Sequence, residues 1–204
     1  MSIKNTILQN LLPYDGEAVY IPDFVDHMLA KKMIEALNDN ILWEQDEFLM
    51  YGKKIITSRK VGWYGSKPFE YTYSRIRRKA HLWNQELNEI RKLIEFETKN
   101  SFNSCLLNLY PRGSDGMGWH SDDEKELGPR PVIASLSLGA ARRFLVRKRV
   151  RVSSERRASV ALVLEPGSLL LMQGDSQRQL QHALPRTRRK IGLRINLTYR
   201  LVTA

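Results

Sequence analysis

The chain has 204 residues, with 33 Lys and Arg against 22 Asp and Glu, a net charge of +11 and one cysteine. This length suits a single domain with a sizeable core, and the lone cysteine excludes an internal disulfide framework and fits a reducing compartment. No apolar run approaches the roughly 18 residues of a membrane span and no cleavable signal is evident, so we expect a protein of the cytoplasm, or of the nucleus in a eukaryote, that is not secreted.

The first half of the chain predicts one short strand and two helices. The strand is expected at 19–24, and Asp26 can cap a helix that runs through Leu37. The residues expected on one side of that helix are Met28, Leu29, Met33, Ala36 and Leu37. The second helix is expected over 78–98, where Trp83, Leu87, Ile90 and Ile94 follow helical spacing.

From residue 102 onward, short apolar runs alternate with turns. The runs cover 104–110, 131–138, 142–149, 159–165, 168–172 and 191–201. Strands at this spacing predict a sandwich or jelly roll, and the Pro-Gly pair at 166–167 is typical of a turn. We expect one domain over 1–204, of the α+β class with a mainly β core, in which 1–101 supplies supporting helices and 102–204 the β core.

The basic residues are clustered in three segments. Segment 142–157 holds eight Lys or Arg against one acid, and 185–190 and 75–79 are also basic. Such patches make phosphate contacts that depend on salt and not on base sequence. The charge therefore favours nucleic acid as partner, with an anionic membrane second. A solvated basic surface without a partner remains an alternative for each cluster.

A histidine and a carboxylate lie two residues apart, at His120 and Asp122, and His182 follows sixty positions later. Most such triplets are ordinary loop residues. Here, however, the chain has four histidines and the pattern uses two of them. Two histidines and one carboxylate are the ligands of a non-haem Fe(II) site, which leaves the opposite face of the metal open. We expect the triplet in a Gly-rich turn and His182 just before the final strand.

The final strand alternates strictly between polar and apolar residues. Its polar side carries Arg194, Asn196, Thr198 and Arg200. Alternation alone also fits a strand with a solvated face. The two arginines are cations suited to a carboxylate-bearing co-substrate, so the strand favours a binding site if the metal pattern is real.

Taken together, these motifs resemble the AlkB-type Fe(II)- and 2-oxoglutarate-dependent nucleic-acid demethylases, and most closely the branch that repairs duplex DNA. The matching segments are 108–110, 120–127, 133–140, His182 and 194–200, within a resemblance from about Tyr20 to Val202. The resemblance implies a double-stranded β-helix, Fe(II) held by His120, Asp122 and His182, and O2 as oxidant. It also implies 2-oxoglutarate held by Asn108, Tyr110, Arg194 and Arg200, with Asn196 and Thr198 as further lining.

The resemblance implies oxidative removal of methyl groups from 1-methyladenine and 3-methylcytosine in DNA, with release of formaldehyde. Region 1–101 would then also recognise the nucleotide. The expected base contacts are a lid of Tyr71, Tyr73 and Ser74, acceptors at Asp123 and Glu124, and a wedge at Tyr51 that fills the gap left by a flipped base. An edge-strand aromatic pair, a solvated acidic turn and a plain hairpin-tip tyrosine are the respective alternatives.

Other functions remain open at this point. The same chemistry could act on RNA, a protein or a small molecule, although the basic clusters argue against a small molecule. A nucleic-acid-binding module without catalysis is a second alternative. We expect a monomer whose partner is DNA, as a duplex or as a single strand, or RNA.

Overall fold

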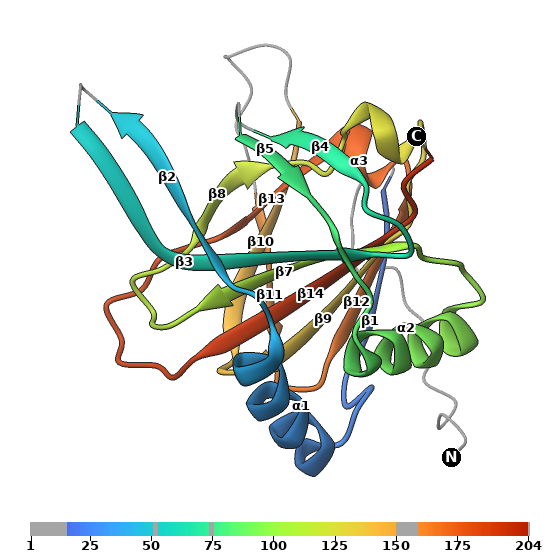
Figure 1. The fold of residues 1–204 in the computed structure, drawn as a ribbon, viewed down its shortest axis with the longest axis horizontal. Helices are drawn as coiled ribbons and strands as arrows, with labels where there is room; N and C mark the ends of the chain where they lie inside the picture. The colour runs from blue at the N-terminus through green and yellow to red at the C-terminus, as the bar shows by residue number, and fades with distance from the viewer. Residues whose placement is uncertain (1–15, 51–52, 74–75, 150–158, 204) are drawn as a thin grey trace.

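The largest of three described β-sheets spans the molecule in the computed structural model (Figure 1). The structure describes residues 16–50, 53–73, 76–149 and 159–203, without the side chains of 46–55 and 71–78. Across this sheet the strands run β1 (Gly16–Ile21), β12 (Leu169–Gly174), β9 (Ile133–Gly139), β14 (Arg194–Arg200), β7 (Ser104–Tyr110), β3 (Lys53–Gly65) and β2 (Glu44–Met50). An eighth strand, β6 (His81–Leu82), pairs with β3 in parallel.

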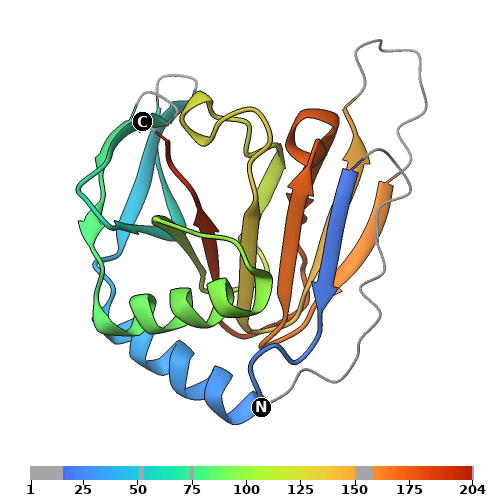
Figure 2. The same cartoon turned by 90° about the vertical axis from the view of Figure 1, so that its right-hand side faces the viewer.

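A four-stranded sheet packs against one face of the larger sheet, as the side view in Figure 2 shows. Its order is β11 (Ser159–Leu164), β10 (Arg142–Lys148), β13 (Leu180–Leu184) and β8 (Met117–His120). A separate hairpin joins β4 (Glu70–Tyr73) to β5 (Ile76–Lys79). The two facing sheets confirm the predicted jelly roll, and strands from both halves of the chain build the larger one.

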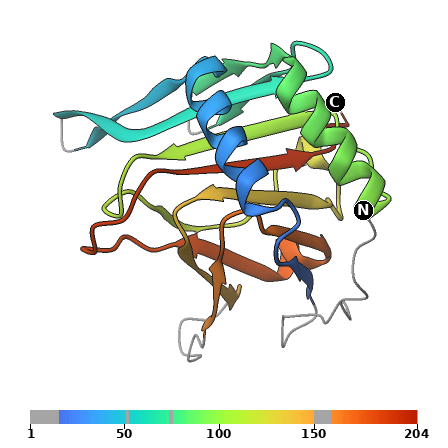
Figure 3. The same cartoon turned by 90° about the horizontal axis from the view of Figure 1, so that it is seen from below.

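Two helices lie across the outer face of the larger sheet, α1 (His27–Asn40) and α2 (Gln85–Thr98), as seen from below in Figure 3. They confirm the predicted buttress. Asp26 caps α1 as predicted, because its side chain accepts a hydrogen bond from the Leu29 backbone N–H at 2.8 Å. The short elements α3 (Ser176–Gln179) and the 3-10 turn η1 (Lys125–Leu127) complete the described helices.

Three predicted details are wrong. The first strand ends at Ile21, and the second helix begins at Gln85 because 76–79 and 81–82 pair as strands instead. The predicted face of α1 is wrong at two positions, because Met28 and Leu29 are 65% and 38% exposed. Leu37 is buried and Met33 packs against the core as predicted, and Ala30 is buried as well on the side of the helix that meets the sheet.

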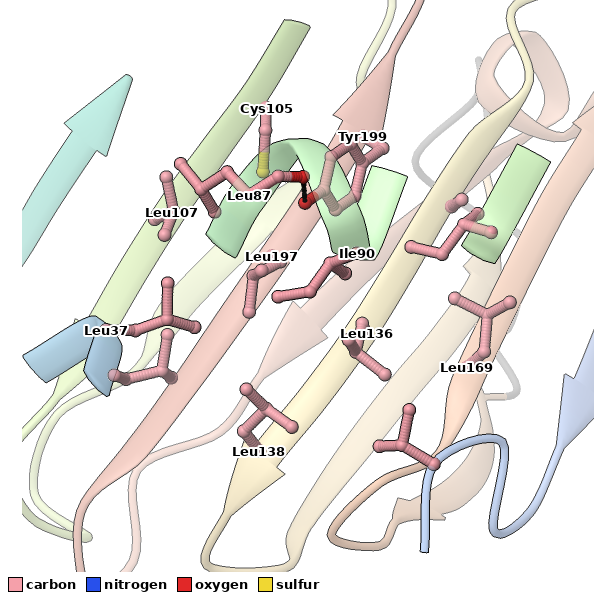
Figure 4. Packing of buried hydrophobic residues seen from close by; sticks show 14 of the residues in the cluster. Leu37, Leu87, Ile90, Cys105, Leu107, Leu136, Leu138, Leu169, Leu197 and Tyr199 are labelled. Carbon is pink, nitrogen blue, oxygen red and sulfur yellow. Dashed lines mark hydrogen bonds between the residues drawn. The ribbon is translucent and has the colours of Figure 1, made fainter. Parts of the chain in front are cut away.

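The larger sheet separates two apolar clusters. One packs α1 and α2 against the sheet, and Figure 4 shows part of it around Leu136, Leu197 and Tyr199. There the Tyr199 hydroxyl donates to the Leu87 carbonyl oxygen at 2.8 Å, which fixes α2 to β14. The predicted burial of Cys105 in this cluster is confirmed. The second cluster fills the space between the sheets.

The two faces of β14 meet different surroundings. Ile195, Leu197 and Tyr199 enter the cluster under the helices, so the alternate residues point between the sheets. Arg194 and Thr198 on that second face are nevertheless buried, at 2% and 7% exposure. The polar side of the strand is therefore not a solvated face but a wall of the interior.

The predicted turn at 166–167 joins β11 to β12. Gly167 has φ +80°, and a Cβ there would lie 2.2 Å from the Val25 carbonyl oxygen, so only glycine fits. The Gly167 backbone N–H donates to the Ser137 carbonyl oxygen, and the Gly167 carbonyl oxygen accepts from the Val25 backbone N–H.

Of the helices described here, none has the length and apolar character needed to cross a membrane.

Candidate active site

The predicted metal ligands, the His-x-Asp triplet and His182, come together at the four-stranded sheet. Strands β8 and β13 are neighbours, and His120 and His182 are register partners with ring centroids 4.2 Å apart. Asp122 lies two residues beyond the end of β8, with Oδ2 3.8 Å from His182 Nε2. The candidate ligand atoms of all three residues lie within 4.8 Å of one another. The triplet was predicted in a Gly-rich turn and His182 just before the final strand, whereas His120 ends β8 and His182 lies within β13.

The electrostatics of the cluster favour metal-binding protonation states. Burial lowers the pKa of His182 to about 4, a direction that His120 and Arg200 reinforce and Asp122 opposes, so the imidazole is neutral at physiological pH. Burial alone would raise the pKa of the Asp122 carboxyl. The charge of Arg200, with smaller contributions from both histidines, lowers that pKa below its usual value. A neutral imidazole and an ionised carboxylate are the forms that bind metal.

Neighbouring groups orient the three side chains. His120 Nδ1 lies 2.8 Å from the Gly118 carbonyl oxygen, so a proton on Nδ1 is donated there and Nε2 is available to a metal. The ring of Phe144 stacks on His182 at 5.3 Å between centroids. Arg200 Nη2 donates to Asp122 Oδ1 and forms an ion pair with it.

The cluster opens into a cavity of about 460 Å³ between the sheets. The strand register explains its lining. Within the larger sheet, Arg194 pairs with Tyr110 and Asn196 with Asn108, so residues on the same face of β14 and β7 lie side by side. The predicted co-substrate residues that line this one cavity are Asn108, Tyr110, Arg194, Asn196, Thr198 and Arg200.

Arg194 is a buried cation in the lining of this cavity. Its Nη2 donates to Asn196 Oδ1 at 2.6 Å and to Ser137 Oγ at 3.0 Å. Its Nε is buried and has no hydrogen-bond partner among the described residues. Burial lowers the pKa of Arg194 to about 10, which leaves the guanidinium charged at neutral pH. A buried cation with an unused donor is suited to a carboxylate ligand.

Tyr110 lies near two guanidinium groups. The central carbon of Arg194 lies 5.4 Å from its ring centroid and that of Arg142 lies 5.9 Å away. Burial raises the pKa of the Tyr110 phenol, although the nearby arginines oppose this, so the hydroxyl stays protonated and can donate. Arg142 Nη2 also donates to the carbonyl oxygens of Asp115 and Pro185, which ties together two loops beside the site.

Two contacts from β3 were not predicted. Arg59 lines the cavity and donates to Asn108 Oδ1, and Ser58 donates to Asp115 Oδ1. The register of β2 against β3 shifts between Gln45 and Glu47, a bulge that re-aims side chains from 57–59. Neither residue carries a local signal for this position, because β3 itself lacks a clear apolar period. Only the long-range pairing of β3 with β7 brings Ser58 and Arg59 to the site.

The residues predicted to contact the base do not all line the cavity. Glu124 lines the cavity, whereas Asp123 is half exposed and paired with Arg149 at the surface. Tyr71 lies in β4 with Tyr73, but the side chains of both are outside the described part of the structure. Tyr51 and Ser74 lie outside the described residues altogether.

Comparison with known proteins agrees with this geometry. The sequence model of the 2OG-Fe(II) oxygenase superfamily matches residues 17–200. The chain is 38% identical over 186 residues to the human alpha-ketoglutarate-dependent dioxygenase alkB homolog 3, covering 89% of this chain and 64% of that protein. It is 33% identical over 214 residues to the DNA oxidative demethylase ALKBH2 of Arabidopsis thaliana, covering 94% and 68%.

The solved structure of OsALKBH1 shares the fold. It superposes with a TM-score of 0.61 at 19% identity, covering 90% of this chain and 96% of that one. The present chain thus spans nearly all of that structure but less than two thirds of the length of the human alkB homolog 3.

Proposed function

This chain belongs to the 2OG-Fe(II) oxygenase superfamily, and from that premise we propose that it oxidatively demethylates bases in nucleic acid. Its substrates are 1-methyladenine and 3-methylcytosine in DNA, and the methyl carbon leaves as formaldehyde. The observation that carries the proposal is one cavity that joins the His120, Asp122 and His182 cluster to the buried Arg194.

The residues fit the iron and co-substrate that the family implies. Two imidazoles and one carboxylate are the donor set of non-haem Fe(II) sites with open positions. The unused Nε of Arg194 and the protonated hydroxyl of Tyr110 suit the distal carboxylate of 2-oxoglutarate. Asn108 and Arg200 would hold the end nearer the metal. When bound with O2, Fe(II) and 2-oxoglutarate supply the oxidising power for hydroxylation of a methyl carbon.

The chain itself provides position and exclusion of water. Arg200 keeps the Asp122 carboxylate ionised and oriented, and the Phe144 ring shields His182. Glu124 lies in the cavity and can accept from the exocyclic amine of a base or favour a base made cationic by methylation. The base must leave its stack to reach this depth, and Tyr71 and Tyr73 would close over it with His120.

Nucleic acid is the partner that the charge favours. The basic segment 185–190 lies beside the site, because the Thr187 backbone N–H donates to Gly113 at 2.8 Å and Arg142 donates to Pro185. The name of the Arabidopsis relative specifies DNA. We propose a duplex partner with Tyr51 as wedge, and a monomer acting in the cytoplasm or a eukaryotic nucleus. RNA is the alternative substrate that this surface fits as well.

The test begins with anaerobic binding of Fe(II) and 2-oxoglutarate, followed by mass analysis of methylated oligonucleotides after O2 is admitted. The expected result is loss of one CH2 unit per lesion together with formaldehyde and succinate, and none of these with the His182→Ala protein. Parallel DNA and RNA strands of one sequence separate the two substrates. Succinate formation without any change of oligonucleotide mass would contradict the proposal.

A further inference from the structure

A buried side-chain amide on α3 reaches the backbone of the candidate metal carboxylate. Gln177 is 2% exposed, and its Oε1 accepts a hydrogen bond from the Asp122 backbone N–H at 2.9 Å. The two residues are 55 positions apart in the chain. Among the described residues, the hydrogen-bond acceptor of the amide Nε2 is a weak one, Met172 Sδ at 3.7 Å. The strong polar contact of this side chain is therefore the one to Asp122.

Asp122 needs such a contact because it lies beyond the end of β8. The strand ends at His120, so the pairing of β8 with β13 stops before the backbone of the carboxylate residue. Gln177 provides that bond, and Ser121 Oγ adds a second tie by donating to the Leu180 carbonyl oxygen at 2.7 Å. Both ties end on α3 or at the start of β13, which carries His182. The segment that carries Asp122 and the segment that carries His182 are thus linked by hydrogen bonds within the protein.

Helix α3, which carries Gln177, is itself anchored to the larger sheet. Ser176 Oγ accepts from the Glu17 backbone N–H at 2.9 Å and lies 2.6 Å from the Gln173 carbonyl oxygen, which anchors α3 to β1 and β12. The neighbours of Gln177 are mostly apolar, and a small cavity of about 10 Å³ beside it is lined by residues such as Val146 and Leu162. An amide in apolar surroundings is costly unless it is hydrogen-bonded, so packing alone does not account for it.

We infer that Gln177 is a positioning residue for the metal site, which fixes the backbone of Asp122 so that its carboxylate faces the two histidines. Arg200 holds Oδ1 of that carboxylate, and Oδ2 remains directed at the ligand cluster. The side chain and the backbone of Asp122 are therefore held by two separate partners, Arg200 and Gln177. The inference rests on the proposed metal site and adds a residue that lies outside the His-x-Asp motif.

The test is an anaerobic Co(II) titration of the metal-free protein, followed by its visible d–d absorption. Gln177→Met keeps the length and volume of the side chain but removes the amide acceptor. Loss of a partner that orients a metal ligand weakens metal binding by about 10- to 100-fold, so we expect a rise of that size in the Co(II) Kd and a changed spectrum. Gln179→Met is the matched control on the same helix, and its Kd and spectrum should equal those of the unchanged protein.

Two further measurements separate positioning from packing. Thermal unfolding without metal reports packing; if Gln177→Met lowers Tm there but leaves the Co(II) Kd unchanged, the inference is wrong. Hydrogen exchange of the Asp122 amide in the unchanged, metal-free protein does not depend on any variant folding. It is expected to be slow, and exchange as fast as at an exposed amide would overturn the inference. Failure of the unchanged protein to bind Co(II) would instead refute the proposed metal site.

Discussion

Replacement of Arg194 by methionine tests the co-substrate site most directly. Arg194 is 2% exposed and lies beside Tyr110 in the cavity wall, with one donor engaged by Asn196 and Ser137 and its Nε without a partner among the described residues. Methionine retains much of the buried length but removes the charge and every donor. The variant should therefore lose affinity for 2-oxoglutarate and keep affinity for nucleic acid.

The size of the loss follows from the contact that is removed. A hydrogen bond to a charged group contributes about 1.5–3 kcal/mol, and about 1.4 kcal/mol corresponds to a factor of ten in affinity. One such contact predicts a loss of about tenfold to 100-fold in 2-oxoglutarate affinity. Burial of an unpaired carboxylate in the variant raises that cost further, so we expect the upper part of this range.

The assay is anaerobic titration of 2-oxoglutarate into the Fe(II)-loaded protein, with DNA binding measured separately in the absence of co-substrate. Arg186→Met is the matched control, since Arg186 is an exposed arginine of the basic segment 185–190. It should show the reverse pattern, with weaker DNA binding and unchanged 2-oxoglutarate affinity. Equal loss of DNA binding by Arg194→Met without co-substrate would assign Arg194 to the phosphate backbone and refute the reasoning.

Four more outcomes are expected. His182→Ala should abolish turnover while circular dichroism shows a retained fold. Normal Fe(II)-dependent turnover by this variant would exclude His120, Asp122 and His182 as the metal site. The metal-free protein should lose stability as pH falls from 6.5 towards 4, because folded His182, with a pKa of about 4, cannot take up the proton that the unfolded chain binds at its ordinary value of 6.5. At about 1.36 kcal/mol for each pKa unit this amounts to about 3 kcal/mol, and urea unfolding of His182→Gln should show a shallower pH dependence; the same slope in both proteins would contradict the shift. Tyr51→Ala should slow repair of methylated duplex more than of single strand, because a wedge offsets an unstacking cost of a few kcal/mol; equal slowing would make it a structural hairpin residue. Charge removal at Arg147, Lys148 and Arg149 should weaken binding to both substrates and flatten its salt dependence, and an unchanged slope would exclude phosphate contacts there.

The parts of the fold that the sequence could predict are those with a strong local pattern. The strand at 104–110 coincides with β7, and the cap of α1 coincides with Asp26, because an apolar run and a capping carboxylate act within a few residues. By contrast β8 has four residues including a glycine, and β13 has five with a histidine at its centre. Neither shows a period of its own, so only pairing with neighbours makes them strands.

The start of α2 shows the same competition. Residues 78–84 continue the helical spacing of the segment, yet 76–79 pair with β4 and 81–82 with β3. The helix then begins where Asn84 accepts from the Leu87 backbone N–H at 2.9 Å. Tertiary pairing overrode a local preference, and the local signal for the later start is Asn84, a residue type that commonly caps helices.

The same distinction between local pattern and long-range pairing applies to the site residues. The spacing of His120, Asp122 and His182 was visible because a metal requires particular side chains at whatever distance the fold permits. Arg59 and Gln177 are ordinary residues whose positions depend on a bulge in β3 and on the anchoring of α3. Their contacts exist only in the folded chain, and a single sequence carries no signal for them. The division of the chain at residue 101 remains a prediction.

Strand register connects the core to the chemistry of this protein. In β14, Ile195 and Leu197 pack under the helices while Arg194 and Asn196 face the cavity, and the pairing of Arg194 with Tyr110 fixes which residues take which side. A shift of one residue would exchange the two faces, placing two cations in the apolar cluster and three apolar side chains beside the metal site. That alternative is strongly disfavoured, because each buried charge would lack a partner. The apolar packing of β14 against α1 and α2 is therefore what delivers its arginines to the site.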